Sequence, residues 1–176
     1  MPTIGVAVAI PEPWAQDLQD YRTSVGDQTA QMIPTHITLV PPYEVSVDDL
    51  TDIEKHLDQV AAGFTSFPIH LRGTGTFRPV SPVVFVSLVE GISQSEQLAA
   101  AVRRGPLELE LEFPFHPHVT IAHHLDDATL DRAFEELAGF ECLFEAEHFH
   151  LYVHDEAVGW QPTRTFDLAP RAGREH

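Results

Sequence analysis

Two short stretches of this sequence, Thr35-His36-Ile37-Thr38-Leu39-Val40 and Pro117-His118-Val119-Thr120-Ile121-Ala122, repeat one pattern of histidine, apolar residue, threonine and two apolar residues. The alternation of polar and apolar residues is typical of a β-strand with one buried face. Successive side chains of a strand point to opposite faces, so each histidine and its threonine share one face, about 7 Å apart along the strand. We expect the apolar residues between them to face a core.

The segments that follow the two motifs also match. A residue suited to cap a helix follows each histidine by nine or ten positions, at Ser46 and at Asp127, with Asp126 as an alternative in the second copy. Apolar periodicity then predicts helices over residues 47–60 and 128–137, each closed by a glycine and followed by a strand. Because there are only two copies, the repeat favours a fold of two similar lobes that face each other, and it does not favour a solenoid.

The remaining segments supply further strands and helices. Apolar patterns predict strands over residues 3–10, 33–40, 67–71, 83–89, 118–122, 142–153 and 163–168, and helices over residues 12–21 and 93–103. The prolines at 41–42 are expected to end a strand, and Gly73-Thr74-Gly75 to form a turn. Residues 107–113 show a further apolar alternation. The sequence therefore predicts an α+β class and a bilobal duplicated fold, with two antiparallel sheets lining a central cleft and helices packed outside. We expect one domain over residues 1–170 and a flexible tail over residues 171–176.

The charge balance limits the kinds of partner. The 176 residues include 27 acidic and 10 basic side chains, a formal net charge of -17, with Lys55 as the only lysine. This surface disfavours long nucleic acid, whose capture needs many cationic contacts to phosphates. The apolar run from Ile4 to Ile10 is far shorter than the about 20 residues that span a bilayer. Cys142 alone can form no internal disulfide. We expect a cytoplasmic monomer that takes a small substrate and has no membrane partner.

A cleft with two histidines and two threonines suits phosphodiester chemistry. Imidazole has an unperturbed pKa of about 6.5, so one ring can accept a proton from water while the other donates a proton to a leaving oxygen. Threonine hydroxyls can donate to the non-bridging oxygens of a phosphate without a metal or a lysine. The competing interpretation is that His36 and His118 are unrelated histidines on solvent-facing strands.

The sequence resembles the two-histidine phosphoesterase superfamily, in the branch of the 2′,5′ RNA ligases and RNA 2′,3′-cyclic phosphodiesterases (the LigT-like branch). The resemblance rests on residues 34–43 and 115–122, and extends over residues 73–79, 83–88 and 149–168. It implies a bilobal α+β fold with antiparallel sheets around the cleft. It also implies metal-independent processing of cyclic or 2′,5′-linked phosphodiesters of nucleotides or RNA ends, with no cofactor.

Carried over by position, the resemblance makes His36 and His118 the acid/base pair and Thr38 and Thr120 the phosphate-binding hydroxyls. We assign His118 to the activation of water and His36 to the protonation of the departing 2′-oxygen, and the reverse assignment stays open. Many relatives place a basic residue shortly after the second motif, where this chain has His123 and His124. Ligation is a weaker expectation than hydrolysis, because nothing resembles a nucleotide-activating lysine motif.

Other side chains near the motifs are candidate substrate contacts. Tyr43 and Phe77 could stack on a nucleobase, Arg78 could contact a phosphate, and Tyr152 could form a wall of the cleft. Ordinary packing, or a surface arginine, is the competing interpretation for each. Both tryptophans, Trp14 and Trp160, are interpreted as packing residues.

Two other functions fit the same residues. The first is a non-catalytic module on the same fold that binds nucleotides or a protein. The second is a metal hydrolase, which the 11 histidines suggest, especially those at positions 116, 118, 123, 124, 148, 150 and 154. Because no carboxylate ligands with a recognised spacing accompany these histidines, we expect no metal site.

Overall fold

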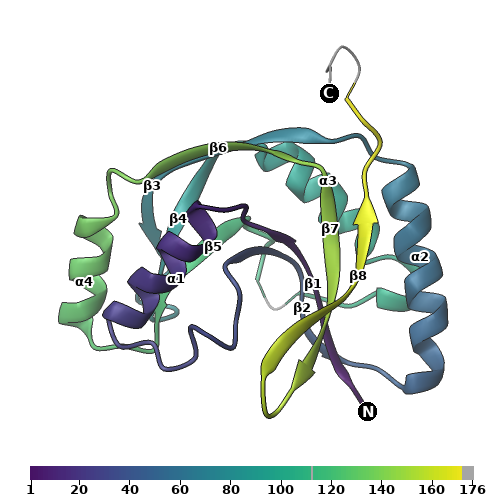
Figure 1. Ribbon diagram of the computed structural model, residues 1–176, viewed down its shortest axis with the longest axis horizontal. Helices are drawn as coiled ribbons and strands as arrows, with labels where there is room; N and C mark the ends of the chain where they lie inside the picture. The colour runs from purple at the N-terminus through teal and green to yellow at the C-terminus, as the bar shows by residue number, and fades with distance from the viewer. Residues whose placement is uncertain (112, 172–176) are drawn as a thin grey trace.

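The computed structural model describes residues 1–111 and 113–171 of the chain, which form two four-stranded antiparallel sheets (Figure 1). The first sheet has the order β2-β1-β7-β8 and consists of β1 (Thr3–Ala9), β2 (His36–Glu44), β7 (His148–Asp155) and β8 (Gly159–Asp167). The second has the order β5-β4-β3-β6 and consists of β3 (Phe67–Thr76), β4 (Val83–Glu90), β5 (His118–His123) and β6 (Glu141–Ala146). The predicted α+β class with two antiparallel sheets is confirmed.

The described residues form four α-helices, two of which pack against the sheet of the other lobe. They are α1 (Trp14–Ser24), α2 (Leu50–Ala62), α3 (Ile92–Val102) and α4 (Asp127–Glu136), with short 3-10 turns at Val47–Asp49 and Gly105–Leu107. Figure 1 shows α1 and α4 beside the second sheet and α2 and α3 beside the first. Helix α1, which follows β1 of the first sheet, contacts β5 of the second, and α3, which follows β4, contacts β2. Each lobe therefore packs a helix that leaves from the other lobe's sheet.

The two motif strands lie at the edges where the sheets meet. Strand β2 is the first strand of one sheet, β5 is the first strand of the other, and the two are in contact. Ile37 and Leu39 are fully buried, whereas His36 and Thr38 are only half-buried on the opposite face. The second motif has the same alternation of buried and half-buried residues. The predicted faces of both strands are confirmed.

The expectation that β2 ends at Pro41-Pro42 is wrong, since the strand continues to Glu44. Its last residues pair with β1, Ile4 with Tyr43 and Thr3 with Glu44. A proline has no N–H to donate, but an edge strand needs donors on only one side. The start is also later than predicted, at His36, because residues 33–35 form a loop.

The turn predicted at Gly73-Thr74-Gly75 is also wrong. Strand β3 runs through these residues to Thr76 and pairs with β4 beyond them. Its register shifts between Leu71 and Thr74, and Gly73 has a φ of 77°, so the chain forms a bulge where the glycines indicated a reversal. At Gly75 a Cβ atom would lie 2.6 Å from the ring of Phe85.

The strand predicted over residues 142–153 is two strands that belong to different sheets. Strand β6 pairs with β3, and β7 pairs with β1 and β8. Strand β8 begins at Gly159, earlier than the predicted start at residue 163, so Trp160 is a strand residue. The alternation over residues 107–113 forms no strand in the described part of that segment, from which Glu112 is left out.

Both predicted helix caps have the expected hydrogen bonds, with the second at the alternative position. Asp49 N donates to Ser46 Oγ at 3.2 Å, and Thr129 N donates to Asp126 Oδ1 at 2.7 Å.

Helix α1 is displaced from residues 12–21 to Trp14–Ser24. Of the predicted tail, residues 172–176 lie outside the described part of the chain. None of the helices in residues 1–111 and 113–171 is long and apolar enough to cross a membrane.

Candidate active site

A cavity of about 240 Å³ lies against the first sheet, beside the motif strands. Its floor includes Gly5 and Ala7 of β1, whose small side chains leave room between β2 and β7. The lining comes from four strands of the first sheet, from β5, from α1 and from the loop before β2. The lining residues are Gly5, Val6, Ala7, Arg22, Ile33, Pro34, Thr35, His36, Thr38, Val40, Pro42, Thr120, His123, Tyr152 and Trp160.

His36 has a hydrogen-bond partner on each ring nitrogen. Nδ1 lies 2.5 Å from the carbonyl oxygen of Pro34, and Nε2 lies 3.0 Å from Thr38 Oγ1. A carbonyl can only accept, so Nδ1 carries the proton in the neutral ring. Nε2 is then the nitrogen that can gain or lose a proton beside the threonine hydroxyl.

His118 repeats this arrangement in the second lobe. Its Nδ1 lies 2.6 Å from the carbonyl oxygen of His116, again the residue two positions earlier. Among the described residues, no side chain or backbone group forms a hydrogen bond with Nε2 of His118. The ring packs edge-on against Phe77, at 4.9 Å between centroids, and against Phe85 at 5.2 Å. Both motifs therefore hold the ring through Nδ1 and leave Nε2 for chemistry.

Burial lowers the pKa of both imidazoles. For His36 the hydrogen bond to Pro34 opposes the effect of burial, and the charges of Arg22 and His118 lower the pKa further. For His118 the bond to the His116 carbonyl raises the pKa and the His116 ring lowers it, with burial dominant. Both rings are therefore neutral in the free protein at neutral pH. His36 and His118 also lie close enough for the charge of one to affect the other.

The structure brings some of the predicted contact residues to the cavity and places others elsewhere. Thr38, Thr120 and Tyr152 line the cavity with His36, whereas His118 is not among the lining residues. The remaining three candidates, Tyr43, Phe77 and Arg78, do not line it either.

Each of these three has another environment. Tyr43 lies near the end of β2 and is partly exposed. Phe77 packs on His118 as described above. Arg78 forms ion pairs across to α4, at 2.9 Å to Asp131 and 3.8 Å to Asp127, so its guanidinium joins the β3–β4 connection to that helix.

Trp160 lines the cavity, although the sequence analysis interpreted it as a packing residue. The indole lies over β1, where a Cβ atom at Gly5 would be at an ordinary contact distance of 3.5 Å from the ring. The backbone N–H of Trp160 donates to the carbonyl of Met32 at 2.8 Å, which joins β8 to the loop before β2.

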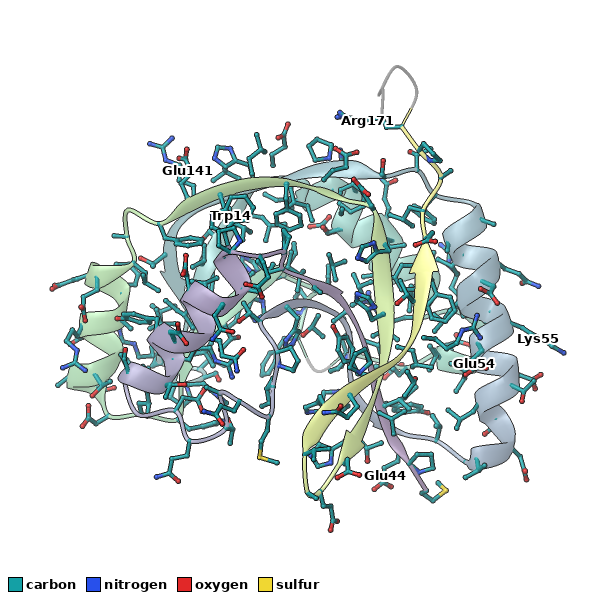
Figure 2. All side chains as sticks on the ribbon, in the orientation of Figure 1. Trp14, Glu44, Glu54, Lys55, Glu141 and Arg171 are labelled. Atoms are coloured by element: carbon teal, nitrogen blue, oxygen red, sulfur yellow. The ribbon has the colours of Figure 1, made fainter. Side chains whose placement is uncertain are left out.

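Two more residues line the cavity that were not expected there from the sequence, Arg22 of α1 and His123 at the end of β5. Among the residues that line the cavity, Arg22 is the one arginine or lysine. Figure 2 shows that the only lysine of the chain, Lys55, points outward from α2. Within residues 1–111 and 113–171, no group of three histidine, cysteine, aspartate or glutamate side chains is arranged to hold a metal ion.

A model of the 2′-5′ RNA ligase superfamily matches residues 10–157 of the chain. The chain belongs to this superfamily. A Bacillus cytotoxicus protein named "Putative phosphoesterase" is 31% identical over 167 residues, which cover 94% of this chain and 96% of the relative.

Solved structures show the same fold as this chain. Escherichia coli LigT in its apo form aligns with a TM-score of 0.73 at 21% identity, over 96% of this chain and 98% of LigT. LigT complexed with 3′-AMP aligns with a TM-score of 0.65 at 19% identity, over 96% and 99%. This superfamily member therefore has the LigT fold, and its relatives support an enzyme of the phosphoesterase kind.

The lowered pKa values predict a loss of stability on mild acidification. Below about pH 6.5 an unfolded histidine binds a proton that buried His36 and His118 do not, so the free energy of unfolding falls as the pH falls below that value. Each ring contributes a slope of up to about 1.4 kcal/mol per pH unit between its unfolded and folded pKa values. Urea unfolding at pH 7.5, 6.5 and 5.5 measures the slope. The variant His36→Gln/His118→Gln should have a shallower slope, and an unchanged slope would contradict the assignment.

Proposed function

We propose that this chain hydrolyses cyclic or 2′,5′-linked phosphodiesters of nucleotides or RNA ends, with nucleoside 2′,3′-cyclic phosphates as the first substrates to test. The observation that carries the proposal is the pair of matched histidines on two contacting edge strands. Each is held by a backbone carbonyl at Nδ1, so each presents Nε2 for proton transfer. General acid and base catalysis of this kind contributes about 10² to 10⁴ in rate.

The hydrogen bonds favour His118 as the base and His36 as the acid. With no partner for His118 Nε2 among the described residues, that nitrogen is open to accept a proton from water. The water oxygen then bonds to phosphorus, the bond from phosphorus to the 2′-oxygen breaks, and protonated His36 donates its Nε2 proton to that oxygen. The negative charge of the bound phosphodiester raises the pKa of the nearby imidazole, so that His36, which is neutral in the free protein, takes up a proton from solvent when the substrate binds.

Thr38 and Thr120 both line the cavity, and their hydroxyls can donate to the non-bridging phosphate oxygens. Thr38 lies 3.0 Å from His36 Nε2, so an oxygen bound there lies beside the proposed acid. These donors carry no charge. They suit a small monoanion in a chain whose net charge of -17 repels long polyanions.

Tyr152 and Trp160 provide an aromatic wall for a nucleobase. Both line the cavity. Stacking of a base on an aromatic ring contributes about 1–3 kcal/mol. The solved complexes of LigT with 3′-AMP and ATP support a nucleotide as the ligand class.

Replacement of either histidine should abolish turnover. His36→Ala and His118→Ala are each expected to lower kcat for nucleoside 2′,3′-cyclic phosphates by at least about 100-fold, because each removes one proton-transfer group. The assay is performed with a chelator present, and the product is identified as the 3′-phosphate. His70→Ala is the matched control, because His70 pairs with Glu141 on β6 and does not line the cavity.

Several outcomes would contradict the proposal. Activity that survives both histidine substitutions would remove the acid/base assignment. Activity lost on chelation would indicate a metal hydrolase, and no turnover of any substrate at any pH would indicate a binding module. A 2′-phosphate product would make the 3′-oxygen the leaving group.

Trp160→Ala should separate base recognition from phosphate chemistry. We expect kcat/KM to fall by about tenfold for nucleoside 2′,3′-cyclic phosphates, in line with a stacking contribution of about 1.4 kcal/mol. Base-free ribose 2,3-cyclic phosphate should be hydrolysed at the unmodified rate, and Trp160→Phe should retain most of the preference for a base. Equal losses on both substrates would show that the indole supports the cavity and does not bind the base.

A further inference from the structure

A buried ion-pair network lies in the cavity wall beside the motif residues. Arg22 is 3% exposed and Asp27 is 7% exposed. Nε and Nη2 of Arg22 donate to Asp27 Oδ2 at 3.3 and 3.2 Å, and His123 Nε2 lies 3.4 Å from the same oxygen. The other carboxylate oxygen accepts from the backbone N–H and the hydroxyl of Thr29, at 2.9 and 2.7 Å. Asp27 is therefore held from three directions.

The network reaches the first motif histidine through two consecutive carbonyls. Arg22 Nη1 donates to the carbonyl of Ile33 at 2.6 Å. The next carbonyl, that of Pro34, accepts from Nδ1 of His36. Because proline restricts its own φ, a guanidinium that holds residue 33 also limits where the Pro34 carbonyl can point. Arg22 thus acts on the group that sets the tautomer and the orientation of His36.

The same carboxylate also contacts the strand of the second motif. His123 is the last residue of β5, and His118 is the first. The arginine belongs to α1, which packs against β5. Asp27 therefore joins the end of one motif strand to the loop that begins the other.

Removing either charge would change the electrostatics at His36 in a defined direction. The charged and titratable groups that affect His36 are Arg22 from α1 and His118 from β5. The guanidinium lowers the pKa of His36, and Asp27 offsets the charge of the guanidinium at 3.2 Å. A buried charge that loses its partner is unstable, so each member depends on the other.

We propose that Arg22 and Asp27 are positioning residues for His36, an inference that rests on the proposed function. They fix its imidazole relative to the second motif strand, and they act through the carbonyls before β2 without touching the phosphate.

The direct test is a titration of the His36 ring. Proton–carbon NMR of the imidazole Cε1 group follows the pKa, with the signal identified by its absence in His36→Gln. Arg22→Met removes the nearby cation, so the pKa of His36 should rise by at least about 0.5 pH unit. Asp27→Asn leaves the guanidinium uncompensated, so the pKa should fall. If Arg22→Met does not fold, Arg22→Met/Asp27→Asn contains neither buried charge, and the pKa of His36 in it should lie above that in Asp27→Asn.

Arg103→Met is the matched control. Arg103 Nη1 also donates to a carbonyl of the first motif strand, that of Leu39, at 3.2 Å, but from the residue that follows α3. This variant removes an arginine anchor from the same strand and should leave the His36 titration unchanged. Shifts in the same direction for Arg22→Met and Asp27→Asn, or no shift in either, would show that the network only stabilises the fold.

Turnover provides a second, separate readout. Asp27→Asn and Arg22→Met should each lower kcat by at least about tenfold with KM within about threefold, because the ring is misplaced while the phosphate donors remain. Arg22→Lys keeps the charge and should leave the His36 pKa unchanged with an intermediate kcat. If the two variants shift the His36 pKa in opposite directions but the unmodified protein shows no turnover, the positioning role is supported and the proposed function is wrong. If the unmodified protein shows turnover but neither variant shifts the pKa, the proposed function is supported and the positioning role is wrong.

Discussion

The contact between β2 and β5 is the constraint on which the site depends. An edge strand has one free side, so two sheets that meet at their edges can bring side chains from both lobes together without a shared backbone ladder. Helices α1 and α3 are exchanged between the lobes and cover β5 and β2 respectively, which holds the two edges in place. The sequence repeat then becomes a repeat in space, with a histidine and a threonine from each lobe.

Hydrogen bonding completes what the strands begin. Each histidine binds the carbonyl two residues earlier through Nδ1, and burial lowers the pKa of each ring. We propose that a monoanionic phosphodiester bound between the two imidazoles raises the pKa of His36, which then takes a proton from solvent. The net charge of -17 disfavours an anionic substrate, and the donors that we propose to bind the phosphate locally are the uncharged hydroxyls of the two threonines in the cavity wall.

Local alternation predicted the motif strands and their faces, because a period of two depends only on neighbouring residues. The strand predicted over residues 142–153 missed the change of sheet at Glu147, where β6 and β7 pair with different partners. The phase of the alternation shifts by one residue there, since the buried position Ala146 is followed by buried Phe149. Glycines at 73 and 75 indicated a turn, but the positive φ of Gly73 forms a bulge, which can use the same backbone conformation as a reversal. Arg22 was hidden for another reason: it lies 14 residues before His36, and only the packing of α1 on β5 brings it to the cavity. Trp160 was not expected in the cavity wall because the predicted strand began at residue 163, whereas β8 begins at Gly159.

The most direct measurement of the central claim is a crystal structure with a nucleoside 3′-phosphate in the cavity. The account predicts that Nε2 of His36 and Nε2 of His118 both lie within hydrogen-bond distance, about 3 Å, of phosphate oxygens, with the two threonine hydroxyls on the remaining oxygens. A phosphate bound by only one of the two histidines, or bound outside the space between β2 and β5, would contradict paired-histidine chemistry.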